Sequence, residues 1–90
     1  MNIDPKKSFL KHVDKIADPT LRAKIKELIA AVKQAKTMQD IPKLKKVKGC
    51  KKGISYRIRV GDYRIGVEIV GNVVTFVRCQ SRKDIYKSFP

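Results

Sequence analysis

The stretch YRIRVGDYRIGVEI, residues 56–69, decides the fold. On both sides of Gly61-Asp62, apolar side chains alternate with charged or small ones, which is the period of two expected of half-buried β-strands. Gly at the first place of a two-residue turn accepts the positive φ that a type II′ β-hairpin requires. The segment therefore predicts two antiparallel strands joined by a tight turn.

The flanking sequence predicts one more strand after this hairpin and two helices before it. Gly71-Asn72 repeats the turn pattern and leads into a third strand at 73–79. Apolar residues recur at helical spacing over 8–17 and again from residue 21 to about residue 36. Between them, Pro19 disfavours a helical Asp18, and Asp18 or Thr20 is expected to cap the second helix.

The predicted fold class is α+β, with a twisted antiparallel sheet backed by an N-terminal helical hairpin. The order is β-α-α-β-β-β followed by a short C-terminal helix or tail, and residues 1–3 are a candidate edge strand. A chain of 90 residues suits one domain, since domains usually have about 50–250 residues. We therefore expect a single domain over residues 1–90.

Composition argues against several classes of protein. We find no run of about 18 apolar residues, as a membrane-spanning helix needs, and no apolar core of a secretory signal. Two cysteines and one histidine are too few for a disulfide scaffold or for most zinc sites. We expect a cytoplasmic protein without metal or cofactor, with His12 at the surface and Cys79 half-buried in a strand.

A strong positive charge points to an anionic partner. The chain has 22 Lys or Arg against 8 Asp or Glu, for a formal net charge of +14. Residues 1–42 carry nine basic and five acidic residues, whereas residues 43–90 carry thirteen and three. The second half thus holds most of the excess, and a nucleic acid is favoured over a merely solvated surface.

Three arginines are predicted to share one face of the sheet. If Gly61-Asp62 is the whole turn, Arg59 lies directly opposite Arg64, and residues across an antiparallel pair point to the same side. Arg57 is two residues before Arg59 and shares that side. Like charges opposite one another are destabilising, so the arrangement indicates an anion site, for which arginine forks suit phosphate oxygens.

We call the surface formed by Arg57, Arg59 and Arg64 the arginine face. Lysines and a basic tail flank it. The segment KLKKVKGCKK, residues 43–52, precedes the first strand of the hairpin and is a candidate phosphate-backbone rail. The tail SRKDIYKSFP, residues 81–90, places Tyr86 beside Arg82 and Lys83. A tyrosine among cations can stack on an unpaired base. Alternatively, the tail is an apolar segment that packs on the sheet.

The hairpin YRIRVGDYRIGVEI and the later string RKDIY together resemble the RelE/ParE superfamily of toxins from type II toxin–antitoxin systems. The resemblance covers nearly the whole chain, since SFLKHVDKI, the following helix and KLKKVKG fit the family order. It implies a small twisted sheet backed by a helical hairpin. RelE-like members cleave messenger RNA in the ribosomal A site, whereas ParE-like members poison DNA gyrase.

The RelE-like side of the family is favoured by the basic sheet face and the tail tyrosine. The resemblance then implies attack of an RNA 2′-hydroxyl on the neighbouring phosphate, without a metal ion. Arg64 matches the arginine that contacts the scissile phosphate, Arg82 a tail position that stabilises the phosphate or leaving group, and Tyr86 the tyrosine that orients the base. The predicted catalytic residues are Arg59, Arg64, Arg82 and Tyr86, and the predicted RNA-binding residues are Lys45, Lys46, Lys48, Lys51, Lys52, Arg57 and Lys83.

Two departures from the family pattern leave the proton acceptor unassigned. Arg57 and Arg59 stand where relatives often have lysine, and arginine keeps its proton. Ser81 stands where many relatives have histidine. Lys51, Lys52 or the ribosome are the candidates that remain, or the acceptor is dispensable.

The resemblance also implies partners. These are a cognate antitoxin whose acidic or amphipathic segment covers the arginine face, messenger RNA in the ribosome, and operator DNA only through the antitoxin, with no membrane. The alternatives are a ParE-like gyrase inhibitor without nuclease chemistry, or a basic nucleic-acid-binding module without toxicity.

Overall fold

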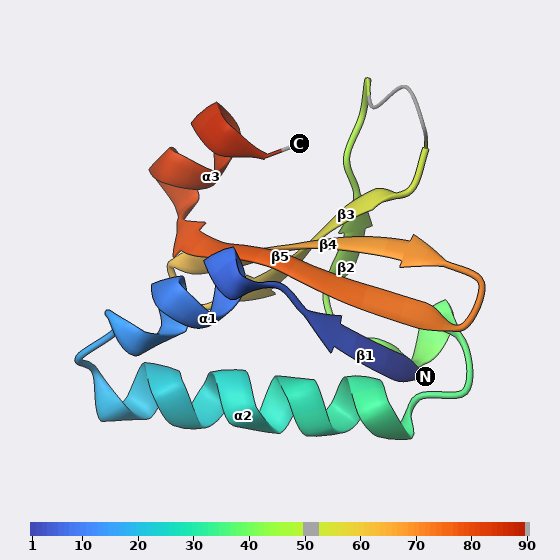
Figure 1. The fold of residues 1–90 in the computed structure, drawn as a ribbon, viewed down its shortest axis with the longest axis horizontal. Coiled ribbons are helices and arrows are strands. Elements are labelled where there is room, and N and C mark those ends of the chain that lie inside the picture. Colours follow the sequence, from blue (N-terminus) through green and yellow to red (C-terminus); the bar gives the residue numbers. More distant parts are fainter. Residues whose placement is uncertain (50–52, 90) are drawn as a thin grey trace.

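A five-stranded sheet with helices on both faces forms the framework of the molecule (Figure 1). The structure is a computed structural model that describes residues 1–49 and 53–89. The elements in chain order are β1 (Asn2–Pro5), α1 (Lys7–Asp14), α2 (Pro19–Gln34), the 3₁₀ turn η1 (Met38–Asp40), β2 (Leu44–Lys46), β3 (Ser55–Val60), β4 (Tyr63–Val70), β5 (Val73–Ser81) and α3 (Arg82–Ser88). The strands lie in the order β1-β5-β4-β3-β2.

The central meander β3-β4-β5 has the predicted register. Val60 pairs with Tyr63 and Arg59 with Arg64, so Gly61-Asp62 is the whole turn. Gly61 and Gly71 both have φ 58°, a left-handed conformation that glycine adopts without Cβ strain. Both predicted hairpins and the α+β class are confirmed.

The two edge strands complete the sheet and differ from the prediction in detail. β1 runs parallel to β5, with Ile3 beside Val74, so the sheet is mixed rather than wholly antiparallel. β2 pairs antiparallel with β3, with Lys45 beside Arg57, and it lies in the lysine-rich segment 43–52, where no strand was predicted. Three residues are too few to show an alternating pattern, and two of the three are lysines, which do not indicate a strand.

α1 and α2 cover one face of the sheet (Figure 1). Asp18 is the N-cap of α2, and its carboxylate accepts hydrogen bonds from the Thr20 N–H at 2.9 Å and the Leu21 N–H at 3.4 Å. The main core lies between this helical layer and the sheet, where the rings of Phe9 and Phe76 stack with centroids 5.1 Å apart. The helical hairpin thus covers the sheet face opposite the arginines.

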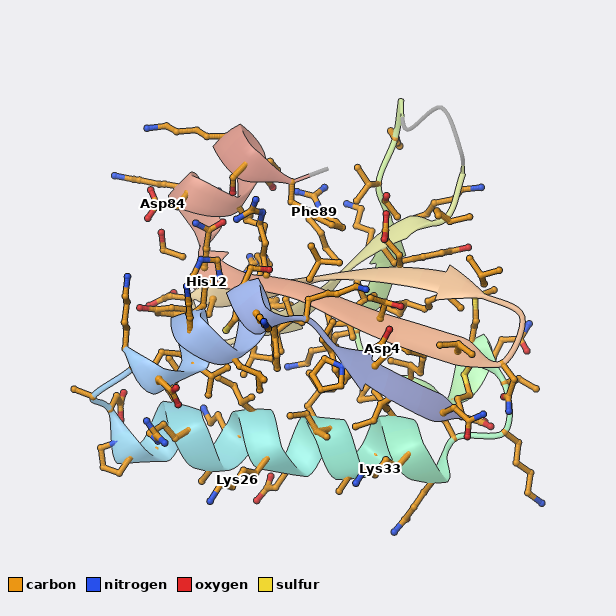
Figure 2. The ribbon with its side chains drawn as sticks, in the orientation of Figure 1. Asp4, His12, Lys26, Lys33, Asp84 and Phe89 are labelled. Atoms are coloured by element: carbon orange, nitrogen blue, oxygen red, sulfur yellow. The ribbon has the colours of Figure 1, made fainter. Side chains whose placement is uncertain are left out.

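α3 covers the other face of the sheet through a second, smaller apolar cluster. Val47, Ile85 and Phe89 are buried there, and Val77 packs against them. Figure 2 shows Phe89 turned from the end of α3 toward the sheet, where its ring covers Gly66. Within the described residues, no helix is both long and apolar enough to cross a membrane.

Candidate functional site

The predicted arginine face lines a cavity of about 400 Å³ on the α3 side of the sheet. Arg57 and Arg59 reach it from β3 and Arg64 from β4, because strand pairing places all three on one face. The lining side chains are Lys43, Lys45, Arg57, Arg59, Arg64 and Tyr86. Alternation along two strands therefore brings three arginines to a single hollow, which we call the arginine pocket.

Arg64 is held in place by the turn of its own hairpin. Its Nη1 donates hydrogen bonds to the carbonyl oxygens of Gly61 and Tyr63, each at 3.0 Å. A guanidinium has five N–H donors, so donors remain on its other nitrogens for a phosphate oxygen. The turn therefore orients Arg64 before any ligand arrives.

Arg57 and Tyr86 join the sheet to α3 across the pocket. The guanidinium carbon of Arg57 lies 4.6 Å from the centroid of the Tyr86 ring, within the range of a cation–π contact. A hydrogen bond from Arg57 and its positive charge lower the pKa of the Tyr86 hydroxyl, and the charges of Arg82 and Arg64 add to the effect. Tyr86 is 63 % exposed, so its ring remains available to a ligand.

The arginine pocket is strongly positive and has no internal counter-charge. Five cationic side chains line it and no carboxylate does. Among residues 1–49 and 53–89, the ion pair within 4.0 Å is Lys6–Asp4, at 3.7 Å and exposed. Closely spaced cations without partners repel one another, so a bound polyanion would relieve that repulsion.

Further lysines line two adjoining cavities. One lies beside Arg57, Tyr86 and Phe89, and the other extends to Gly49 and Gly53. Lys45, Lys46 and Lys48 line both, with Val47 between them. These predicted RNA-binding lysines therefore continue from the arginine pocket along β2. Lys51 and Lys52, predicted for the same role, lie outside the described residues.

The remaining predicted site residues lie at the start of α3. The N–H of Arg82 donates to the Asp62 carbonyl at 2.9 Å, which brings this end of α3 beside the β3–β4 turn. Arg82 is close enough to lower the pKa of Tyr86, although its side chain is not part of the pocket lining. Lys83 is exposed on α3 and does not line the cavities described above.

Sequence reasoning missed Lys43 as an individual site residue. Its side chain lines the arginine pocket, and its backbone φ of 57° is the one positive value outside glycine in the described part of the chain. A signal existed, because Pro42 can occupy the second position of a type II turn, whose next residue has positive φ. Gly or Asn is usual there, so a lysine is unexpected.

Two residues on the other side of the sheet are more buried than predicted. They are His12, expected at the surface, and Cys79, expected to be half-buried but in fact buried. His12 is partly buried, and its Nδ1 accepts a hydrogen bond from the Cys79 N–H at 3.2 Å. Burial lowers the pKa of His12, with Arg78 and Lys15 adding to the shift. Burial also raises the pKa of the Cys79 thiol to about 11, so this thiol is a poor nucleophile at neutral pH.

Metal-ligating side chains do not gather anywhere in the described ranges. Across residues 1–49 and 53–89, no three His, Cys, Asp or Glu side chains are placed to hold a metal ion.

Comparison with known proteins assigns the family. The model of the ParE toxin of type II toxin–antitoxin systems matches residues 3–86. Toxin RelE3 of Methanocaldococcus jannaschii is 38% identical over 85 residues, which are 93% of each chain. The chain belongs to the RelE/ParE superfamily of toxins. It is a RelE-like toxin of a type II toxin–antitoxin system.

Solved structures of the superfamily share the fold. The RelB–RelE antitoxin–toxin complex from Methanococcus jannaschii matches with a TM-score of 0.80 and 34% identity, over 97% of this toxin and 99% of that chain. The YoeB dimer from Staphylococcus aureus matches with a TM-score of 0.72 over 91% and 97% of the two chains. Its identity is 19%, so that likeness concerns the fold alone.

Proposed function

We propose that this toxin is a ribosome-dependent endoribonuclease that cleaves messenger RNA in the A site and so stops translation in the cytoplasm. The observation that carries the proposal is the arginine pocket, in which five cations and a tyrosine meet without a carboxylate. The similarity to toxin RelE3 also supports the RelE-like function over the ParE-like one.

The proposed reaction is an intramolecular transesterification of RNA. The 2′-oxygen forms a bond to the adjacent phosphorus while the bond from phosphorus to the 5′-oxygen breaks. The products are a 2′,3′-cyclic phosphate and a 5′-hydroxyl, which takes its proton from water. Negative charge develops on the phosphorane and on the leaving oxygen, where preorganised cations lower the barrier.

Arg64 and Arg59 are the proposed phosphate clamp, and Arg57 and Lys45 add positive charge beside them. Arg64 is already oriented by the Gly61 and Tyr63 carbonyls, so little reorganisation is needed when the phosphate binds. Arg82, at the start of α3, is proposed to stabilise the leaving oxygen. Lys46, Lys48 and Lys83 are proposed to bind flanking phosphates, because phosphate contacts dominate RNA affinity.

Tyr86 is the proposed proton acceptor as well as the base-stacking residue. A general base works best when its pKa is near the operating pH, and Arg57 lowers the pKa of this hydroxyl. The arginines cannot fill the role, since a guanidinium keeps its proton in proteins. The tyrosinate would accept the proton of the 2′-hydroxyl, and its ring would stack on the neighbouring base.

A cognate antitoxin is the proposed regulator. The complex from Methanococcus jannaschii pairs a RelE toxin with a RelB antitoxin. For this toxin we propose an antitoxin segment, acidic or amphipathic, that covers the arginine pocket and neutralises its charge. Contact with operator DNA would then come through the antitoxin.

The test is induction of the toxin in cells, followed by primer extension on abundant messages. We expect cleavage within codons for the wild type and loss of cleavage and of growth arrest for Arg64→Ala, in a protein that folds normally. The matched control is Lys26→Ala, which removes a cation from the outer side of α2 (Figure 2) and should leave cleavage unchanged. Full cleavage by Arg64→Ala would contradict the role of Arg64.

The second candidate function is inhibition of DNA gyrase, which the match to the ParE toxin model favours. A gyrase inhibitor needs a protein-binding surface and no chemistry of its own. Induction would then trigger the DNA-damage response while messages stay intact. That result would select the gyrase inhibitor over the ribonuclease.

A further inference from the structure

Lys43 occupies a backbone conformation that its residue type disfavours. Its φ is 57°, where the Cβ of an L-residue crowds the following carbonyl oxygen. Glycine fits that conformation without strain, and asparagine tolerates it. A sequence chosen for stability alone would therefore have Gly or Asn after Pro42, so the lysine side chain needs a reason of its own.

The position of Lys43 supplies that reason. Its side chain lines the arginine pocket together with Arg59 and Arg64. Lys43 and Arg59 also line a neighbouring cavity of about 380 Å³ between α2 and the end of β3. Lys43 thus lies where the two cavities meet, and its exposed side chain serves both.

The two cavities differ in chemistry, and the difference limits what Lys43 can bind. The second cavity is lined partly by apolar side chains such as Leu28 and Val60. Besides Lys43 and Arg59, its charged residues are Lys24 and Glu27, whose charges offset each other. The net positive charge of this cavity therefore comes from Lys43 and Arg59, so a phosphate is expected at the end that these two residues share with the arginine pocket. Backbone strain that persists next to a cluster of functional groups is typical of ligand-binding positions.

We propose that Lys43 is a substrate-binding residue that contacts the phosphate next to the scissile phosphate, at the mouth of the arginine pocket. The strained turn is retained because it places the Lys43 ammonium at this junction. The inference rests on the proposed RNA substrate and adds a second phosphate-binding position to that site. Arg59 would hold the scissile phosphate while Lys43 holds its neighbour.

The test separates the side chain of Lys43 from its backbone. Lys43→Gly removes both the charge and the strain, Lys43→Asn removes the charge in a residue that tolerates positive φ, and Lys43→Arg keeps the charge. The probe is a short 2′-O-methyl oligoribonucleotide, which cannot be cleaved. Its affinity is measured between about 0.05 and 0.2 M salt, and the thermal midpoint of each variant is measured in parallel.

We expect Lys43→Gly to melt no lower than the wild type and to bind the probe about fivefold more weakly at 0.1 M salt. One lost phosphate contact on a single strand reduces the magnitude of the slope of log K against log salt by about 0.7. If the affinities of the two proteins coincide at 1 M salt, that difference amounts to about fivefold at 0.1 M. Lys43→Asn should bind as weakly as Lys43→Gly, and Lys43→Arg should keep the wild-type slope. Lys26→Ala, the matched charge control, should change neither quantity.

Wild-type affinity and salt slope in Lys43→Gly would overturn the proposal, as would an equal loss in Lys26→Ala. A lower melting temperature of Lys43→Gly would overturn the claim that the turn is strained. The readout is independent of cleavage. If the wild type binds the probe through Lys43 yet cuts no message, the nuclease function fails and the Lys43 contact stands.

Discussion

At the scale of single residues, Tyr86 is the side chain of the arginine pocket whose pKa is shifted by its neighbours. Its hydroxyl has a lowered pKa because Arg57 hydrogen-bonds to it and places a positive charge beside it. Both effects favour the tyrosinate. The fraction of tyrosinate therefore rises at a lower pH than for a free tyrosine, whose pKa is about 10.

This environment predicts a pH dependence that can be measured in two ways. Ultraviolet titration, as the difference between wild type and Tyr86→Phe, should show Tyr86 ionising below pH 10, and Arg57→Gln should move that ionisation upward. If Tyr86 is the base, the cleavage rate should rise with pH up to the lowered pKa, and Arg57→Gln should shift the rise to higher pH. An unchanged profile in Tyr86→Phe would contradict the role as base.

Residue-level predictions succeeded where a single strand register determines position. The opposition of Arg59 and Arg64 follows from a two-residue turn, so the sequence alone predicts it. His12 could not, because its hydrogen bond to the Cys79 N–H joins residues far apart in the chain. A turn at Lys43 could have been predicted, because Pro42 precedes it. Its positive φ could not, because lysine rarely adopts that conformation.

At the scale of elements, α3 forms one wall of the site, and its position depends on Gly66. A Cβ built on Gly66 would lie 2.8 Å from Cγ of Phe89, closer than packed carbon atoms approach. The missing side chain lets the Phe89 ring lie on β4 and so fixes the end of α3. Tyr86, three residues earlier, is positioned by the same contact.

A double-mutant cycle tests this packing. Gly66→Ala should lower the free energy of unfolding by about 1–3 kcal/mol, as overpacking does, and urea denaturation measures it. In a Phe89→Ala background the same change should cost less, because the ring that it collides with is gone. Val70→Ala, an exposed change on the same strand, is the control and should be additive with Phe89→Ala. Additivity of Gly66→Ala with Phe89→Ala would contradict the contact.

The docking of α3 also shows where sequence reasoning stopped. Two readings of the tail remained open, an apolar segment on the sheet and a base-stacking tyrosine. The first is confirmed, because Ile85 and Phe89 are buried against the sheet. The second stays a prediction, with which the exposed ring of Tyr86 is compatible. A seven-residue helix has too few turns for its period to be read reliably. Its local start signals are the cap Ser81, whose side chain accepts the Asp84 N–H at 3.3 Å, and the acidic Asp84 in the first turn.

At the scale of the whole molecule, the net charge of +14 is divided between two faces. Lys26 and Lys33 lie on α2 (Figure 2), on the face of the sheet that α1 and α2 cover, whereas the arginine pocket lies on the α3 side. Composition could predict an anionic partner but not this division, which depends on how strands and helices pack. The sequence of the meander predicted the fold class and the arginine face. The strand β2 and the docking of α3 against the sheet could not be predicted and were found in the structure.

The central claim is that the arginine pocket cleaves messenger RNA within the ribosome. It is tested most directly by adding the purified toxin to ribosomes with a defined message and an empty A site, and mapping the message ends. The account predicts a cut within the A-site codon, a 2′,3′-cyclic phosphate and a 5′-hydroxyl at the new ends, and a rate at least about 100-fold lower for Arg64→Ala. An intact message with the wild-type toxin, at concentrations that arrest growth, would contradict it.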